Sequence, residues 1–99
     1  MQIEQLRDHA REFGLFFSKH AIYMIAERNI TKDDVLDVIL NGEIIEEYTE
    51  QRYGPCFLIY GRTSSKRHLH VACSLLSRVR IVTIYEPDPD RWIEYRVRK

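Results

Sequence analysis

The chain has 99 residues, of which 44% are hydrophobic, 11% aromatic and 30% charged. This length and composition predict one folded domain over residues 1–99 and exclude a disordered chain, and no apolar run approaches the roughly 20 residues that cross a bilayer. The start of the chain, Met1 to Gln5, carries no secretory signal, so the cytoplasm is the expected location and a membrane is not an expected partner.

The charges divide between the two halves of the chain although the formal net charge is zero. Residues 1–50 hold five basic and eleven acidic side chains, and residues 51–99 hold ten and four. No acidic residue lies between Glu50 and Glu86, a stretch that contains Arg52, Arg62, Lys66, Arg67, Arg78 and Arg80. Such a stretch is typical of an anion-binding face, and equally of a solvated surface with segregated charges.

Apolar periodicity and capping residues predict three helices in the first half, over residues 3–13, 19 to about 28, and 32–41. Gly14 ends the first helix. Ser18 is a suitable N-cap for the second, and Thr31 with Asp34 three residues later begins the third. Gly42 closes the third helix.

After Gly42 the pattern alternates, and β-branched and aromatic residues predict strands near 43–49, 56–62, 68–75 and 79–86. Short connections make these strands an antiparallel meander. The expected fold is therefore α+β, with N-terminal helices packed on one face of a four-stranded antiparallel sheet. The tail from Trp92 to Val97 either adds an edge strand or packs Trp92 over the end of the sheet.

Alternation also assigns side chains to the two faces of the sheet. In the third strand the side expected to face the helices holds Leu69, Val71, Cys73 and Leu75, and the opposite side holds His68, His70, Ala72 and Ser74. In the fourth strand Arg80, Val82 and Ile84 are expected on the helix side, and Ile81, Thr83 and Tyr85 opposite. The face away from the helices is thus predicted to be exposed, and replacing His70 there is expected to change stability by no more than about 0.5 kcal/mol.

A histidine, hydroxyl groups and guanidinium groups on one face suit metal-free cleavage of RNA, which needs a base, an acid and cations. His70 is the candidate general acid or base, and Tyr85 and Thr83 are candidates for orienting the scissile phosphate. These residue types are also ordinary on an exposed sheet face. His20 at the start of the second helix is a further candidate, with capping or packing as its alternative.

No metal site or cofactor is predicted. Cys56 and Cys73 are too few for a disulfide framework and are interpreted as small buried hydrophobic residues. Cys73 lies on the opposite face from His68 and His70, and no fourth ligand has a suitable spacing for zinc.

Several sequence blocks together resemble the domain-of-unknown-function family 4258. The blocks are Ser18-Lys19-His20-Ala21, Glu27-Arg28-Asn29-Ile30-Thr31, Asn41-Gly42-Glu43-Ile44-Ile45-Glu46, Tyr53-Gly54-Pro55, Tyr60-Gly61-Arg62, His68-Leu69-His70-Val71 and Ile81-Val82-Thr83-Ile84-Tyr85-Glu86-Pro87-Asp88-Pro89. The resemblance extends over about residues 15 to 99.

This resemblance implies kinship with RelE-type and MqsR-type toxins, the small ribonucleases of bacterial toxin–antitoxin pairs, and so a RelE- or barnase-like fold. It also implies a cognate antitoxin as partner, of a zinc-finger type in many pairs. The residues that match the family's polar positions are His20, Arg28, His70, Thr83 and Tyr85.

The leading hypothesis is a metal-independent endoribonuclease of the mRNA-interferase kind, acting on free or ribosome-bound mRNA. Its catalytic candidates are His70, Tyr85, Thr83 and His20, and its RNA-binding candidates are Arg62, Lys66, Arg67 and Arg28. The alternative is a non-catalytic module that holds RNA or a partner protein on the same basic sheet face.

Overall fold

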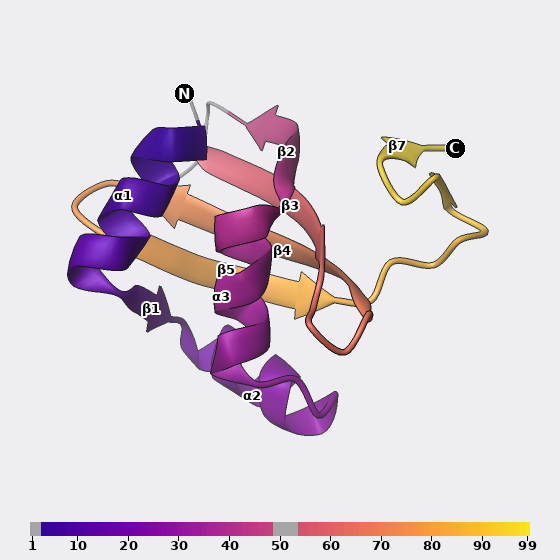
Figure 1. The fold of residues 1–99 in the computed structure, drawn as a ribbon, viewed down its shortest axis with the longest axis horizontal. Helices are drawn as coiled ribbons and strands as arrows, with labels where there is room; N and C mark the ends of the chain where they lie inside the picture. Colours follow the sequence, from indigo (N-terminus) through magenta and orange to yellow (C-terminus); the bar gives the residue numbers. More distant parts are fainter. Residues whose placement is uncertain (1–2, 49–53) are drawn as a thin grey trace.

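The computed structural model describes residues 3–48 and 54–99 (Figure 1). The elements in chain order are α1 (Ile3–Phe13), β1 (Leu15–Phe17), α2 (Lys19–Glu27), α3 (Lys32–Asn41), β2 (Glu43–Tyr48), β3 (Cys56–Arg62), β4 (His68–Leu75), β5 (Val79–Tyr85), β6 (Trp92–Ile93) and β7 (Val97–Arg98). The α+β class is confirmed. Thr49, the end of one expected strand, and Arg52 of the basic stretch lie outside the described residues. In the described part of the chain, no helix is long and apolar enough to span a membrane.

Local side-chain chemistry sets the ends of the three helices. Gly14 adopts a φ of 75° directly after α1, a conformation that glycine tolerates better than other residues. The Ser18 hydroxyl accepts a hydrogen bond from the Ala21 amide at 3.0 Å and caps α2. Thr31 and Asp34 form a reciprocal capping box at the start of α3, with distances of 3.0 and 2.9 Å. The helix starts predicted from these residues are confirmed.

The sheet has five strands in the order β1-β5-β4-β3-β2 and is mixed. The four expected strands pair antiparallel, but β1 pairs parallel with β5, so that Leu15 lies beside Val79 and Phe17 beside Ile81. The expectation of a purely antiparallel four-stranded sheet is therefore inexact. Strand β1 has three residues, too few to show an alternation of apolar and polar side chains. Its partner strand also lies about 60 residues further along the chain.

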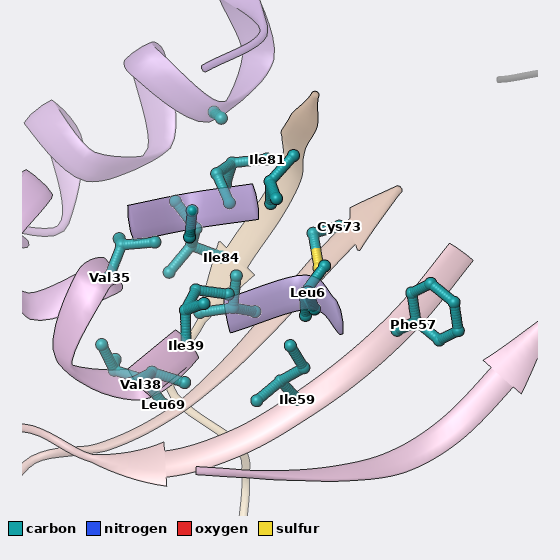
Figure 2. Packing of buried hydrophobic residues seen from close by; sticks show 14 of the residues in the cluster. Leu6, Val35, Val38, Ile39, Phe57, Ile59, Leu69, Cys73, Ile81 and Ile84 are labelled. Atoms are coloured by element: carbon teal, nitrogen blue, oxygen red, sulfur yellow. The ribbon is translucent and has the colours of Figure 1, made fainter. Parts of the chain in front are cut away.

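The three helices pack on one face of the sheet and form the hydrophobic core with it (Figure 2). Each helix supplies at least one fully or nearly fully buried apolar residue, among them Leu6 of α1, Ala21 of α2 and Val38 of α3. The expected inward side of β4 is confirmed, because Leu69, Val71, Cys73 and Leu75 are all buried in this core. Burial raises the pKa of the Cys73 thiol, which is the behaviour of an inert core residue.

A β-bulge interrupts the pairing of β4 with β5. Ala72 lies opposite Thr83 and Cys73 lies opposite Ile81, so Val82 is the extra residue. A bulge shifts the alternation by one position, which a strict period of two does not predict.

The bulge changes which residues of β5 face the core. Ile81 and Ile84 are both fully buried against the helices, whereas Arg80 lies on the opposite face, where it pairs with Ser74. The expected faces of Arg80 and Ile81 were therefore wrong. Thr83 and Tyr85 lie on the face away from the helices, as predicted.

Candidate functional site

The polar residues predicted as a site belong mainly to the sheet face opposite the helices, called here the outer face. The strand registers place on it Phe16, Glu43, Glu46, Tyr48, Cys56, Leu58, Tyr60, Arg62, His68, His70, Ala72, Ser74, Arg80, Thr83 and Tyr85. His70 lies between Tyr60 on β3 and Tyr85 on β5. The structure thus brings His70, Thr83 and Tyr85 together on neighbouring strands.

His70 is fully buried, with an exposed fraction of 0%. Its Nε2 donates a hydrogen bond to the backbone carbonyl oxygen of Tyr95 at 2.6 Å. Since a carbonyl only accepts, the neutral ring carries its proton on Nε2, and Nδ1 accepts a hydrogen bond from the Tyr85 hydroxyl at 3.1 Å. Burial lowers the pKa of His70 below its ordinary value, so the imidazole is held neutral with both nitrogens occupied.

The C-terminal segment 92–98 buries this part of the outer face, and is called here the C-terminal cover. It contains the two short strands β6 and β7, which pair with each other and not with the main sheet. The Trp92 ring packs edge-on against His70 with centroids 4.4 Å apart, and the Tyr95 ring stacks on His68 at 3.9 Å. Of the two alternatives for the tail, the packing of Trp92 on the sheet is the one observed.

Two ion pairs attach the C-terminal cover to strand β2. Arg96 Nε lies 2.5 Å from Glu43 Oε1, and Arg98 Nε lies 2.8 Å from Glu46 Oε2. The hydrogen bond from Arg98 lowers the pKa of Glu46, which favours its charged form. The Arg98 guanidinium also lies over the Trp92 ring at 4.7 Å. Acidic side chains of the first half of the chain thereby hold basic side chains of the last few residues.

The prediction of an exposed site around His68 and His70 is wrong for this structure. Alternation correctly assigned both side chains to the outer face, but it carries no information about a distant segment that folds back onto that face. His68 is half-buried beneath Tyr95, and burial lowers its pKa as well. Access to His70 requires displacement of the C-terminal cover.

Beyond the C-terminal cover, a smaller polar pair lies at the edge of the sheet. His20 Nε2 lies 3.5 Å from Thr83 Oγ1, and the side chain of His20 is exposed. Tyr85 is two residues further along β5 on the same face and half-buried. Burial raises the pKa of the Tyr85 hydroxyl, so this group stays protonated. The predicted candidates therefore differ in exposure: His20 is exposed, Thr83 and Tyr85 are half-buried, and His70 is fully buried.

Two of the four predicted RNA-binding cations bind the protein's own backbone. Arg28 donates from Nη1 to the carbonyl of Ile84 at 2.8 Å, at the edge of β5 that the short strand β1 does not reach. Arg67 donates to the carbonyls of Arg28 and Asn29 at 3.1 and 2.7 Å and forms an ion pair with Glu86 at 2.8 Å. These contacts give both arginines a structural role.

The other two predicted cations, Arg62 and Lys66, are exposed at the β3–β4 hairpin. Within residues 3–48 and 54–99, neither takes part in an ion pair. Arg62 lies opposite His68 in the register, so it borders the C-terminal cover. Both side chains are available to a ligand in solution.

Among the described residues, no group of three or more His, Cys, Asp or Glu side chains is arranged to hold a metal ion. Cys56 and Cys73 are both free thiols.

Sequence reasoning missed a second group of residues on the outer face, around Phe16 on β1. The guanidinium groups of Arg78 and Arg80 lie over the Phe16 ring at 4.9 and 5.4 Å from its centroid. Phe16 lies more than 60 residues before these arginines in the chain, and the pairing of β1 with β5 brings it to them. The sequence feature that pointed to this group was the basic stretch between Glu50 and Glu86, which contains Arg78 and Arg80.

Fold and site together define a small α+β domain with a polar sheet face that its own C-terminal segment partly covers. A family model described as "Domain of unknown function (DUF4258)" matches residues 17–86, and the chain belongs to this family. The matched region contains all eight predicted site residues, and the C-terminal cover lies beyond it. No curated protein and no solved structure matches the chain significantly.

Proposed function

We propose that this chain is a non-catalytic RNA-binding module that uses the exposed basic part of its outer face. The observation that carries this proposal is the state of His70, which is fully buried and has both ring nitrogens in hydrogen bonds. A general acid or base must reach the substrate proton, and this residue is closed to substrate. Arg62 and Lys66 at the β3–β4 hairpin remain exposed, so binding is better supported than catalysis by His70.

The charge distribution favours RNA as the ligand. Three exposed cations border the two ends of strand β4. Arg62 and Lys66 lie on the β3–β4 hairpin, and Arg78 lies on the β4–β5 turn. A single strand of RNA presents regularly spaced phosphates and unstacked bases, and it can follow such a face. Phosphate contacts of this kind release counterions and make affinity depend strongly on salt.

A salt titration of binding tests the proposal. The binding of a short fluorescein-labelled single-stranded RNA is measured by fluorescence anisotropy over a range of salt concentrations, for the wild type and for Arg62→Ala and Lys66→Ala. Each variant is expected to weaken binding at low salt and to flatten the slope of log K against log salt by about 0.7. Arg11→Ala on helix α1 is the charge-matched control and should bind like the wild type. Affinity that does not change with salt would contradict the proposal.

A metal-independent endoribonuclease, the toxin of a toxin–antitoxin pair, is a second candidate. The exposed contact between His20 and Thr83 favours it, because an imidazole and a hydroxyl lie together beside Tyr85. In such a reaction a base removes the proton of a 2′-hydroxyl, the oxygen attacks the adjacent phosphorus, and an acid protonates the leaving 5′-oxygen. His20 supplies the base or the acid, and a cognate antitoxin is the expected partner.

Cleavage assays separate the second candidate from the first. If His20 takes part in catalysis, the His20→Gln variant is expected to lose RNA cleavage and to keep RNA binding. Thr83→Val is expected to reduce the rate, and Lys19→Gln, next to His20 on the same helix, is the control. Cleavage that is unchanged in His20→Gln would eliminate this assignment.

A further inference from the structure

The end of the outer face away from the C-terminal cover carries a cavity of about 340 Å³. Its lining residues come from β1, from β4 and β5 and from the turn between these two strands, and they are Phe16, Ser74, Leu76, Ser77, Arg78 and Arg80. Ser74 lies four residues beyond His70 on β4, which places the cavity about 13 Å along the strand from that histidine. Figure 1 shows β1 and the C-terminal strand β7 on opposite sides of the molecule.

The chemistry of this cavity is divided between apolar and cationic surfaces. Phe16 and Leu76 are exposed by 40% and 66%, although both are large hydrophobic residues. The guanidinium groups of Arg78 and Arg80 lie over the Phe16 ring, and none of the six lining residues is acidic. A ligand that fits has a flat apolar part for the ring and an anionic part for the guanidinium groups.

A second cavity of about 380 Å³ lies directly beside the first and shares Phe16, Ser77 and Arg78 with it. Its other lining residues include Phe13, which is 64% exposed. Each of the two adjoining cavities is therefore lined by at least one aromatic side chain and by Arg78, and each has a volume at the lower end of the range for small-ligand sites. Two adjoining cavities of similar lining suit successive units of a polymeric ligand better than one isolated anion.

We propose that Phe16, Leu76 and Arg78 form a binding site for a nucleotide of single-stranded RNA. The base packs against Phe16 and Leu76, and the phosphate binds the guanidinium group of Arg78. Base stacking on an aromatic residue tolerates any sequence, so the site contributes affinity without strong sequence preference. The proposal rests on RNA binding as the proposed function and locates it at this end of the outer face.

The test uses the full chain and two substitutions that separate stacking from charge. Anisotropy of a fluorescein-labelled single-stranded RNA is measured for Phe16→Leu, which keeps apolar volume but removes the ring, and for Arg78→Gln. Phe16→Leu is expected to weaken binding about 5- to 100-fold with an unchanged salt slope. Arg78→Gln is expected to weaken binding and to flatten the slope by about 0.7.

Tyr23→Leu is the matched control, because Tyr23 is an exposed aromatic residue on α2, and it should bind like the wild type. Thermal unfolding verifies that each variant is folded. Wild-type affinity and salt slope in both Phe16→Leu and Arg78→Gln would overturn this site and leave the proposed function standing if Arg62→Ala weakens binding. A wild-type chain that binds no RNA would overturn both.

Discussion

Replacing His70 by alanine tests the closed outer face through protein stability. The substitution removes two hydrogen bonds, from Nε2 to Tyr95 and from the Tyr85 hydroxyl to Nδ1, each worth about 1 kcal/mol. It also removes edge-to-face ring contacts with Tyr85 and Trp92, worth about 0.5 kcal/mol or more each. The expected loss in the free energy of unfolding is about 3 kcal/mol. For a domain of this length that corresponds to a decrease in Tm of about 12–24 °C.

The assay is thermal unfolding followed by circular dichroism at neutral pH, with His20→Ala as the matched control. His20 is an exposed histidine, so its replacement is expected to change stability by no more than about 0.5 kcal/mol. If His70→Ala and His20→Ala unfold within about 4 °C of each other, His70 is not enclosed beneath the C-terminal cover.

Three further expectations concern pH and two structural residues. Burial lowers the pKa of His70 in the folded state. The neutral side chain therefore contributes stability at pH values above the unfolded pKa of about 6.5, and this contribution is lost as pH falls through the folded pKa. In urea unfolding, His70→Gln should show a smaller decrease in the free energy of unfolding between pH 7 and 5 than the wild type. Arg67→Ala should cost about 1–2 kcal/mol in chemical unfolding, because Arg67 hydrogen-bonds two carbonyls at the end of α2, while Arg62→Ala should cost less than about 0.5 kcal/mol. Gly42→Ala should cost about 1–3 kcal/mol by the same measurement, because the added Cβ would overlap the Tyr60 carbonyl oxygen; an unchanged midpoint would contradict this packing.

Local sequence signals predicted most of the secondary structure. The caps at Ser18 and Thr31 depend on residues within four positions along the chain, and hydrogen bonds of that range are encoded in short segments. Alternation in β4 was equally reliable for the inward side, because every inward side chain there is buried in the hydrophobic core. The helix starts and the inward side of β4 could therefore be assigned without knowledge of distant contacts.

The errors arose where distant parts of the chain meet. The pairing of β1 with β5 and the bulge at Val82 depend on backbone register between strands, which side-chain periodicity does not encode. The enclosure of His70 depends on Trp92 and Tyr95, which lie more than 20 residues further along the chain. The candidate residues were placed on the correct face, but their exposure was set by this non-local packing.

The most direct test of the account is one reaction that measures RNA binding and RNA cleavage together. Purified wild-type protein is mixed with end-labelled single-stranded RNA in the presence of a chelator at several pH values, and samples are taken for anisotropy and for a denaturing gel. We expect salt-dependent binding with the RNA intact at every pH. Cleavage that is abolished by His70→Gln in a folded variant would contradict it, because a fully buried histidine would then be reaching the substrate.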